Sequence, residues 1–236
     1  MKKIITIVLA ITSIIGCTSK NDSNEVNTSS VYSFSQGGII TDIDGNSYPT
    51  ILTNCSNQKW MQKNLNVSRF RNGDIIPQVT NIKTWTNLTS PAWCYYNNDA
   101  ANGTIYGKIY NGYAVNDPRG LAPLGYHIPT DTEWTSLTNC LGGELIAGGK
   151  LKETGNSYWL QPNSNATNSS GFSGLPGGFR NTGSSFQELG YYGNFWSSLG
   201  NATYAIPRTL NYNNGTISLI DAYDDADGFS VRCIKD

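Results

Sequence analysis

Turn-forming residues interrupt this chain so often after Ile39 that most of it can form only short strands and loops. Asp42–Asn46 contains the Asp-Gly pair of a tight hairpin, and Tyr48–Leu52 follows it as a strand. Lys59–Leu65 and Thr104–Tyr110 carry large apolar residues at close to the strand period of two. The pattern therefore predicts a fold that is rich in short β-strands.

One segment has the complete pattern of an α-helix. In Pro129–Glu133 a proline precedes the capping residue, Thr130 or Asp131, and the glutamate lies where a capping box places it. One face of the expected helix carries Trp134, Leu137 and Leu141, and Gly142-Gly143 ends it. We expect a second helix within Leu145–Glu153.

The last third of the chain is expected to be irregular. Glycine, proline and asparagine dominate Glu153–Gly200, which predicts long loops over few strands. We expect a strand pair within Ala202–Ile220, with Asn213–Gly215 as its turn, and a final strand at Phe229–Ile234. Residues 39–236 are therefore predicted to form an α+β domain with a twisted antiparallel sheet, one or two helices and long irregular loops.

The N-terminus has the pattern of an export signal. Met1–Lys3 supplies two lysines, and the apolar run Ile4–Ile15 is too short to span a bilayer but fits the core of a secretory signal. The residues that precede Cys17 resemble a bacterial lipobox, in which the peptide is cut before the cysteine and the cysteine is acylated. We expect a signal peptide over 1–16 and a flexible, lipidated tether over 17–38; the alternative is an ordinary signal peptide with an unrelated cysteine. Several acyl chains would hold the protein stably on a membrane, at the outer membrane or cell surface.

Composition narrows the possible functions. Charged residues make up 14% of the chain, against about 25% in ordinary soluble domains, which indicates an extracellular, β-rich protein. The net charge is −1 and the signs of the charges are scattered along the chain, so there is no basic stripe and nucleic acid is excluded as a partner.

The roughly 200 residues after the tether fit one large domain or two small ones. No linker divides them.

Four cysteines remain besides Cys17. An even number in an exported chain favours two disulfides, and three connectivities are open. The chain has one histidine, His127, so it has no zinc-type spacing. We interpret His127 as a buried, hydrogen-bonded histidine and not as a catalytic base. The four cysteines are Cys55, Cys94, Cys140 and Cys233.

Acidic clusters supply the candidates for a metal site. An acidic loop before the last strand can offer the carboxylate oxygens that Ca²⁺ prefers, although a solvated acidic turn is the alternative. The first hairpin also alternates acidic and amide residues, at Asp42, Asp44 and Asn46, but it lacks the glycine and glutamate positions of an EF-hand. Ca²⁺ is therefore the one cofactor that we consider, at Asp221, Asp224, Asp225 and Asp227.

Aromatic residues are the main candidates for ligand contact. Exposed rings beside amides commonly bind carbohydrate, through stacking and directional hydrogen bonds. Here Trp and Tyr must also build the core, because large aliphatic residues are scarce. We expect Trp60 and Trp134 in the core. We expect an even division between core and surface for Trp93, Tyr95, Tyr96, Trp159, Tyr191, Tyr192 and Trp196.

Six phrases follow one another in a recognisable order between about Ile39 and Asp236. They are Asp42–Asn46, Trp60–Leu65, Tyr106–Asn111, Tyr113–Val115, Gly125–Trp134 and Ser170–Arg180. Together with the ending Gly228–Asp236, they resemble the Fibrobacter succinogenes major paralogous domain family. Two positions depart from that pattern. Gly112 stands where the family commonly has tryptophan, and Ala122 stands where it often has cysteine.

The resemblance implies a location, a fold and a disulfide pattern. Members of the family are mostly exported or surface-anchored bacterial proteins. At a greater distance the chain is similar to C-type-lectin-like folds, including relatives of the formylglycine-generating enzyme, in which a helix cysteine commonly bridges to the last strand. This implies that Cys140 pairs with Cys233 and Cys55 with Cys94. The formylglycine-generating enzymes use reactive cysteines near their C-terminus, but the position of Cys233 suits a disulfide better.

The resemblance also implies a ligand site. Lectin-like calcium sites draw on a long loop, and Gln161-Pro162-Asn163 looks like their tripeptide, while their Trp-Asn-Asp phrase is missing. Together with the aromatic set, this tripeptide predicts ligand contacts from Trp159, Gln161, Asn163, Tyr191, Tyr192 and Trp196. We expect a non-catalytic surface lipoprotein that binds a glycan or a protein partner through the loop-rich face 156–200. The alternatives are an enzyme that acts on polysaccharide and a structural surface component without a small ligand.

Overall fold

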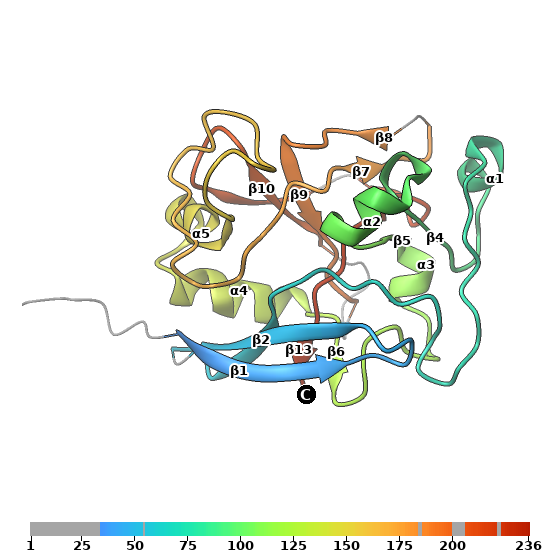
Figure 1. Ribbon diagram of the computed structural model, residues 1–236, viewed down its shortest axis with the longest axis horizontal. Coiled ribbons are helices and arrows are strands. Elements are labelled where there is room, and N and C mark those ends of the chain that lie inside the picture. The colour runs from blue at the N-terminus through green and yellow to red at the C-terminus, as the bar shows by residue number, and fades with distance from the viewer. Residues whose placement is uncertain (1–33, 54, 184–185, 200–205, 221–222) are drawn as a thin grey trace, which may run out of the picture. The chain divides into compact units, whose positions relative to one another are not determined.

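A long hairpin forms the start of the described chain. Strands β1 (Phe34–Thr41) and β2 (Ser47–Thr53) pair antiparallel, and the turn between them is the predicted Asp-Gly turn, with Gly45 at a φ of +86°. Tyr48 and Ile51 of β2 are buried. The structure is a computed structural model that describes residues 34–53, 55–183, 186–199, 206–220 and 223–236 (Figure 1).

The domain begins earlier than the sequence predicts. The tether was expected to continue to residue 38, but Phe34–Thr41 forms a strand that pairs with β2, so residues 34–38 belong to the fold. The predicted signal peptide, 1–16, and Cys17 lie outside the described residues. The described residues form one compact unit. None of their helices is long and apolar enough to span a bilayer.

The last strand of the chain lies inside the first sheet. The strand order is β1-β2-β3-β13-β6, and all neighbours are antiparallel. Ile234 pairs with Trp60 on one side and with His127 on the other. Because β6 leads directly into the helix after Pro129, the terminal strand lies beside the start of that helix. The strands are β3 (Gln58–Met61), β6 (Tyr126–His127) and β13 (Ile234–Lys235).

Two further sheets contain the remaining short strands. One has the order β11-β10-β9, with β9 (Tyr192–Phe195), β10 (Arg208–Asn211) and β11 (Ile217–Leu219). The other has the order β4-β5-β12-β7-β8, with β4 (Trp93–Cys94), β5 (Ile109–Asn111), β7 (Phe179–Arg180), β8 (Phe186–Gln187) and β12 (Gly228–Phe229).

These sheets confirm the α+β class and correct its details. Three antiparallel sheets replace the single sheet that we expected. The predicted pair within Ala202–Ile220 is confirmed as β10 and β11, with Asn213–Gly215 between them, while residues 200–205 lie outside the description. The expected final strand, Phe229–Ile234, is divided into β12 and β13, which lie in different sheets. The terminal segment therefore joins two sheets.

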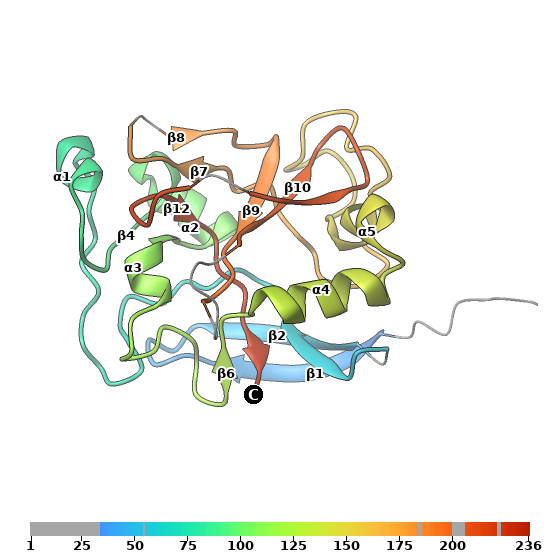
Figure 2. The same ribbon diagram turned by 180° about the vertical axis from the view of Figure 1, so that it is seen from behind.

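Helix α4 (Asp131–Cys140) begins as predicted. The Thr130 hydroxyl accepts a hydrogen bond from the Glu133 N–H, and the Glu133 carboxylate accepts one from the Thr130 N–H at 2.8 Å. This closes the capping box. The second predicted helix is α5 (Glu144–Leu151). Both ribbon views show α4 between the first sheet and the strands β9 and β10 (Figures 1 and 2).

Three more α-helices appear in the described chain, beyond the one or two that we expected. The segment Thr104–Tyr110, predicted as a strand, is instead the end of α2 and the start of β5. Asp99 caps α2 by accepting a hydrogen bond from the Ala101 N–H, and Gly107 ends it at a φ of +74°. The additional helices are α1 (Ile82–Thr86), α2 (Ala100–Tyr106) and α3 (Gly112–Val115), and Tyr96–Asn98 forms a 3₁₀ turn.

Aromatic side chains build the core. Trp60 and Trp134 are both buried, as predicted, with ring centroids 4.9 Å apart. Trp196 is fully buried in a neighbouring cluster, and its indole N–H donates to the Tyr110 carbonyl at 2.7 Å. The indoles of Trp60, Trp134 and Trp196 thus cover much apolar surface while the N–H of each keeps a partner. This compensates for the scarcity of large aliphatic residues.

The predicted disulfide pairing is wrong. Cys55 bonds to Cys140, with Cα atoms 5.7 Å apart, while Cys94 and Cys233 are buried free thiols. Cys55 lies at the β2–β3 turn, and the bridge ties that turn to the last residue of α4. Cys233 lies in the apolar cluster that contains Ala122, where the family often has cysteine. That cluster contains no second cysteine with which Cys233 could pair.

Candidate functional site

The residues predicted to form one ligand-binding surface are divided between core and surface. Trp159 and Trp196 are buried, and the Trp159 indole N–H donates to the Gly174 carbonyl at 3.0 Å. Asn163 is also buried, and its amide donates to two loop carbonyls, those of Glu153 and Gly155. Gln161, Tyr191 and Tyr192 keep at least part of their surface in solvent. The structure therefore does not bring the six predicted residues together as one exposed surface, and ligand binding by them stays a prediction.

The wider aromatic set is divided in the same way. Trp93 and Tyr96 belong to the core together with Trp159 and Trp196. Tyr95 and Tyr192 are partly buried, and Tyr191 is exposed. More of these aromatic residues therefore lie in the core than the expected even division between core and surface.

The acidic residues before the last strand hold the backbone of their own loop. Asp227 accepts hydrogen bonds from the N–H groups of Thr182 and Asp224, at 2.8 and 2.9 Å. Asp224 in turn accepts from the Ala226 N–H at 2.8 Å. Asp221 lies outside the described residues. Within the described part of the chain, no three His, Cys, Asp or Glu side chains gather as metal ligands, so Ca²⁺ at this cluster stays a prediction.

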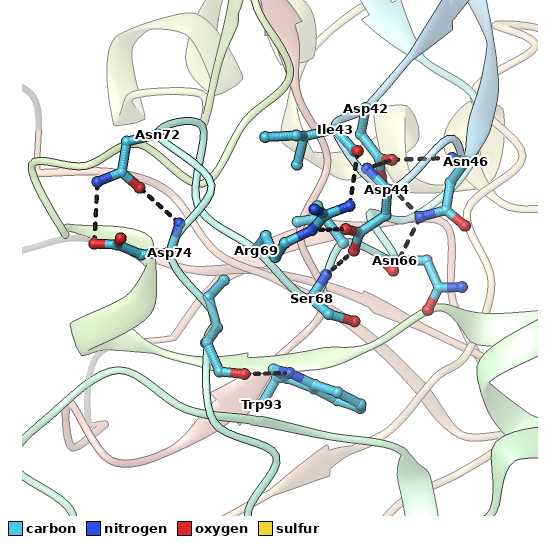
Figure 3. A network of polar contacts seen from close by, with 12 residues as sticks. Asp42, Ile43, Asp44, Asn46, Asn66, Ser68, Arg69, Asn72, Asp74 and Trp93 are labelled. Carbon is cyan, nitrogen blue, oxygen red and sulfur yellow. Dashed lines mark hydrogen bonds and ion pairs between the residues drawn. The ribbon is translucent and has the colours of Figure 1, made fainter.

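The alternating acidic segment of the first hairpin is a hydrogen-bonded turn (Figure 3). Asp42 accepts from the N–H groups of Asp44 and Asn46, both at 2.9 Å. Asp44 forms an ion pair with Arg69 at 2.6 Å and accepts from the Ser68 N–H. Hydrogen bonds from Ser68 and Arg69 keep the pKa of Asp44 below its usual value, although burial opposes them. The Asp42 carboxylate thus holds the turn itself, and the Asp44 carboxylate ties the turn to the segment that follows β3.

A cavity of about 510 Å³ is the strongest candidate for a binding site. Ligand pockets commonly have volumes of about 300 to 1,000 Å³. Three other cavities have volumes of about 360, 290 and 160 Å³. The 510 Å³ cavity lies where β2, the segment after β3, helix α2 and the loop after α5 meet. Its lining includes Gln62, Lys63, Asn64, Ile105, Glu153, Tyr158 and Arg232.

The smallest of these four cavities adjoins the 510 Å³ cavity. The 160 Å³ cavity shares four lining residues with it, Lys63, Asn64, Thr104 and Ile105. Its other walls include the amide side chains of Asn46 and Asn66. We call the two cavities together the Tyr158 groove. The groove therefore passes from an aromatic, charged end to an amide-rich end.

Arg232 holds the base of the groove together. Its side chain is fully buried, and its guanidinium donates to the Asn64 side-chain oxygen at 2.6 Å and to the Ser173 carbonyl at 3.0 Å. It also donates to the carbonyls of Met61 and Phe172. Burial lowers the pKa of Arg232, but a guanidinium stays protonated at neutral pH. Arg232 thereby joins the segment after β3 to the irregular loop around residue 173.

The walls of the groove combine an exposed ring with polar groups. Tyr158 is 42% exposed, and its ring lies edge-on to the ring of Tyr106, with centroids 6.2 Å apart. The Glu153 carboxylate accepts a hydrogen bond from the Asn168 amide at 3.0 Å. Gln62 donates to the Gly171 carbonyl at 2.8 Å, which fixes its amide at the rim. A stacking surface and oriented hydrogen-bonding groups therefore lie within one cavity.

Two other side chains, Asp117 and His127, are of types that can act in catalysis. Asp117 lines the 360 Å³ cavity together with Asp225. Hydrogen bonds from the Arg119 guanidinium hold the pKa of Asp117 below its usual value, which is the opposite of what a general acid needs. His127 is hydrogen-bonded as predicted, at 2.9 Å to Glu133 and 2.8 Å to Asp236, but its side chain is 37% exposed instead of buried. It links the end of the chain to the start of α4.

The groove residues could not be predicted from the sequence, for identifiable physical reasons. Arg232 was noted only as part of a terminal motif, although an arginine flanked by Val231 and Cys233 in an apolar segment is an unusual choice that signals a buried polar network. Tyr158 stands directly before Trp159, and the sequence does not show which of the two rings stays exposed. The groove joins residues of β2, the segment after β3, α2, the loop after α5 and the terminal segment, and no local pattern could place them together.

The fold and groove define an α+β domain of three antiparallel sheets with one extended cavity on its loop-rich side. The sequence profile of the Fibrobacter succinogenes major domain matches residues 54–235, and the chain belongs to this family. No curated protein and no solved structure matches the chain significantly. The more distant likeness to lectin-like folds stays a prediction.

One departure from the family pattern has a structural explanation. A Cβ atom at Gly112 would lie 2.9 Å from a carboxylate oxygen of Asp225 and 3.1 Å from its Cα. Even an alanine would therefore push against the backbone of that loop. The tryptophan common in the family could not be accommodated unless the loop at Asp225 moved.

Proposed function

We propose that this protein is a lipid-anchored surface lipoprotein that binds a glycan in the Tyr158 groove and does not act on it chemically. The observation that carries this proposal is the 510 Å³ cavity with an exposed tyrosine ring beside amide and carboxylate side chains. A sugar presents apolar C–H faces and several hydroxyl groups. A ring that stacks and side chains that donate and accept hydrogen bonds match both features.

The lining chemistry favours binding over hydrolysis. Most glycoside hydrolases use two carboxyl groups on opposite sides of the bond that is cut. Among the residues described as lining the 510 Å³ cavity, Glu153 is the one carboxylate. The alternative, an enzyme that acts on polysaccharide, would require a second carboxylate to reach the groove. Release of reducing ends from a polysaccharide would favour that alternative.

A glycan array tests the binding proposal. The intact protein is applied with and without a chelator, together with the variants Tyr158→Ala and Tyr191→Ala. The two tyrosines have nearly equal exposure, 42% and 43%, but only Tyr158 lines the groove. We expect Tyr158→Ala to remove most of the binding and Tyr191→Ala to leave it unchanged.

Other outcomes of this experiment would indicate a different site or a different function. Loss of binding in Tyr191→Ala alone would move the site to the surface around Tyr191. Loss of binding in chelator would point to a calcium site such as the acidic cluster before β12. Absence of binding to any glycan on the array, under all conditions, would contradict glycan binding and favour a protein partner or a structural role.

The proposal of a lipid anchor is supported by the N-terminal motif alone. The lipobox-like residues before Cys17 support acylation at that cysteine. Cys17→Ser should move the protein from the membrane fraction to the soluble fraction, with Cys94→Ser as a control that keeps it in the membrane fraction. An unchanged membrane pool in Cys17→Ser would contradict lipid anchoring.

A further inference from the structure

The Tyr158 groove carries an excess of positive charge. Arg232 and Lys63 line the 510 Å³ cavity together with a single carboxylate, that of Glu153. The bonds of the Arg232 guanidinium go to neutral oxygens, one amide and three carbonyls. Because Arg232 is fully buried, little solvent screens its charge from the cavity.

Lys63 lies at the centre of the groove. It lines both the 510 Å³ and the 160 Å³ cavity, so a ligand that extends through the two cavities passes beside it. Its side chain is exposed. Within the described residues, no hydrogen bond or ion pair engages its ammonium group. The Glu153 carboxylate instead accepts a hydrogen bond from the neutral Asn168 amide.

These charges identify the kind of sugar that fits. We infer that the groove selects an acidic oligosaccharide of at least two units, whose carboxylate or sulfate group lies against Lys63. An anionic group there pairs with the free ammonium and also lies in the field of the buried guanidinium. A neutral sugar would leave the excess positive charge uncompensated. This inference rests on the proposed glycan binding and narrows its ligand class.

Matched pairs of glycans provide the test. Trimers of galacturonic, glucuronic and mannuronic acid are each compared with the corresponding hexose trimer, which differs at C6 only. A third set carries sulfate at C6, which distinguishes the two kinds of anionic group. Binding of the intact protein is measured by calorimetry in low and high salt, for wild type, Lys63→Gln, Lys83→Gln and Tyr158→Ala. Lys83 is exposed on α1 and lines none of the four cavities, so it is the matched control.

We expect at least one anionic trimer to bind about tenfold more tightly than its neutral partner at low salt, a difference of about 1.4 kcal/mol. High salt should weaken this preference, because one of the two charges is exposed. Lys63→Gln should remove most of the preference, whereas Lys83→Gln should keep it. Tyr158→Ala should weaken the binding of acidic and neutral trimers alike.

Two results would overturn the inference, and they differ. Equal binding of acidic and neutral trimers, or an acidic preference that Lys63→Gln leaves intact, would refute charge selection, while an effect of Tyr158→Ala on the same trimers would still support glycan binding. Absence of binding for every trimer would overturn the proposed function together with this inference.

Discussion

Replacing Cys55 by serine tests the disulfide that the structure assigns. Cys55 is exposed, so the substitution removes the bond to Cys140 with little loss of packing. Cys140 is 8% exposed and keeps its place at the end of α4 as a free thiol. The change in stability should therefore report the cross-link itself.

The magnitude follows from the loop that the bond closes. The two cysteines are 85 residues apart, and a loop of that length corresponds to about 4.5 kcal/mol of lost conformational entropy in the unfolded chain. Residual structure in the unfolded state and strain in the native state reduce this figure. We expect Cys55→Ser to lower the free energy of unfolding by about 2 to 4 kcal/mol.

Urea unfolding of the intact protein in detergent measures this loss. Wild type in a reducing agent should unfold at the same urea concentration as Cys55→Ser, and the reducing agent should leave the variant unchanged. Thiol labelling should reach Cys94 and Cys233 only after unfolding, because both are buried. A loss below about 0.5 kcal/mol, within the range of ordinary surface substitutions, would refute the reasoning. So would peptide mapping that joins Cys140 to Cys233.

Three further variants test other parts of the structure. Arg232→Leu removes the donor of four buried hydrogen bonds and should cost about 3 to 5 kcal/mol in urea unfolding; a loss near zero would show that Arg232 does not hold the groove together. Hydrogen bonds from Glu133 and Asp236 raise the pKa of His127 above 6.5, so its contribution to stability is complete below pH 6.5 and lost as pH rises through the raised value. Wild type should therefore lose more stability than His127→Gln between pH 6 and 9, and parallel pH profiles would contradict this role. Gly148→Ala should cost about 1 to 3 kcal/mol in thermal unfolding, because its Cβ would lie 2.0 Å from the Thr216 carbonyl oxygen; Gly183→Ala, which has open space, is the control.

Local patterns in the sequence predicted the elements whose causes are local. The capping box at Thr130 and Glu133 needs only residues three positions apart, and α4 begins where they place it. The Asp-Gly turn before Ser47 depends on one glycine at positive φ. The turn at Asn213–Gly215 was found in the same way. The family motifs were also read correctly, since they are linear phrases.

Predictions failed where a local pattern was ambiguous. Thr104–Tyr110 alternates like a strand, but Asp99 caps a helix before it and Gly107 ends that helix, so the segment changes from helix to strand within a few residues. A short apolar run fits either structure until its neighbours in space are known. The sequence also suggested a shared surface for Trp159 and Trp196, but packing buries both of them.

By itself, the sequence determined the family, the α+β class and the capped helix, because linear motifs and local patterns encode them. The tertiary structure alone decided which cysteines meet and which residues line a cavity. Cys55 reaches Cys140 across 85 positions, and Arg232 brings Asn64 and Ser173 to one guanidinium. Such contacts depend on how the sheets and loops pack in three dimensions, and sequence spacing carries no record of that packing.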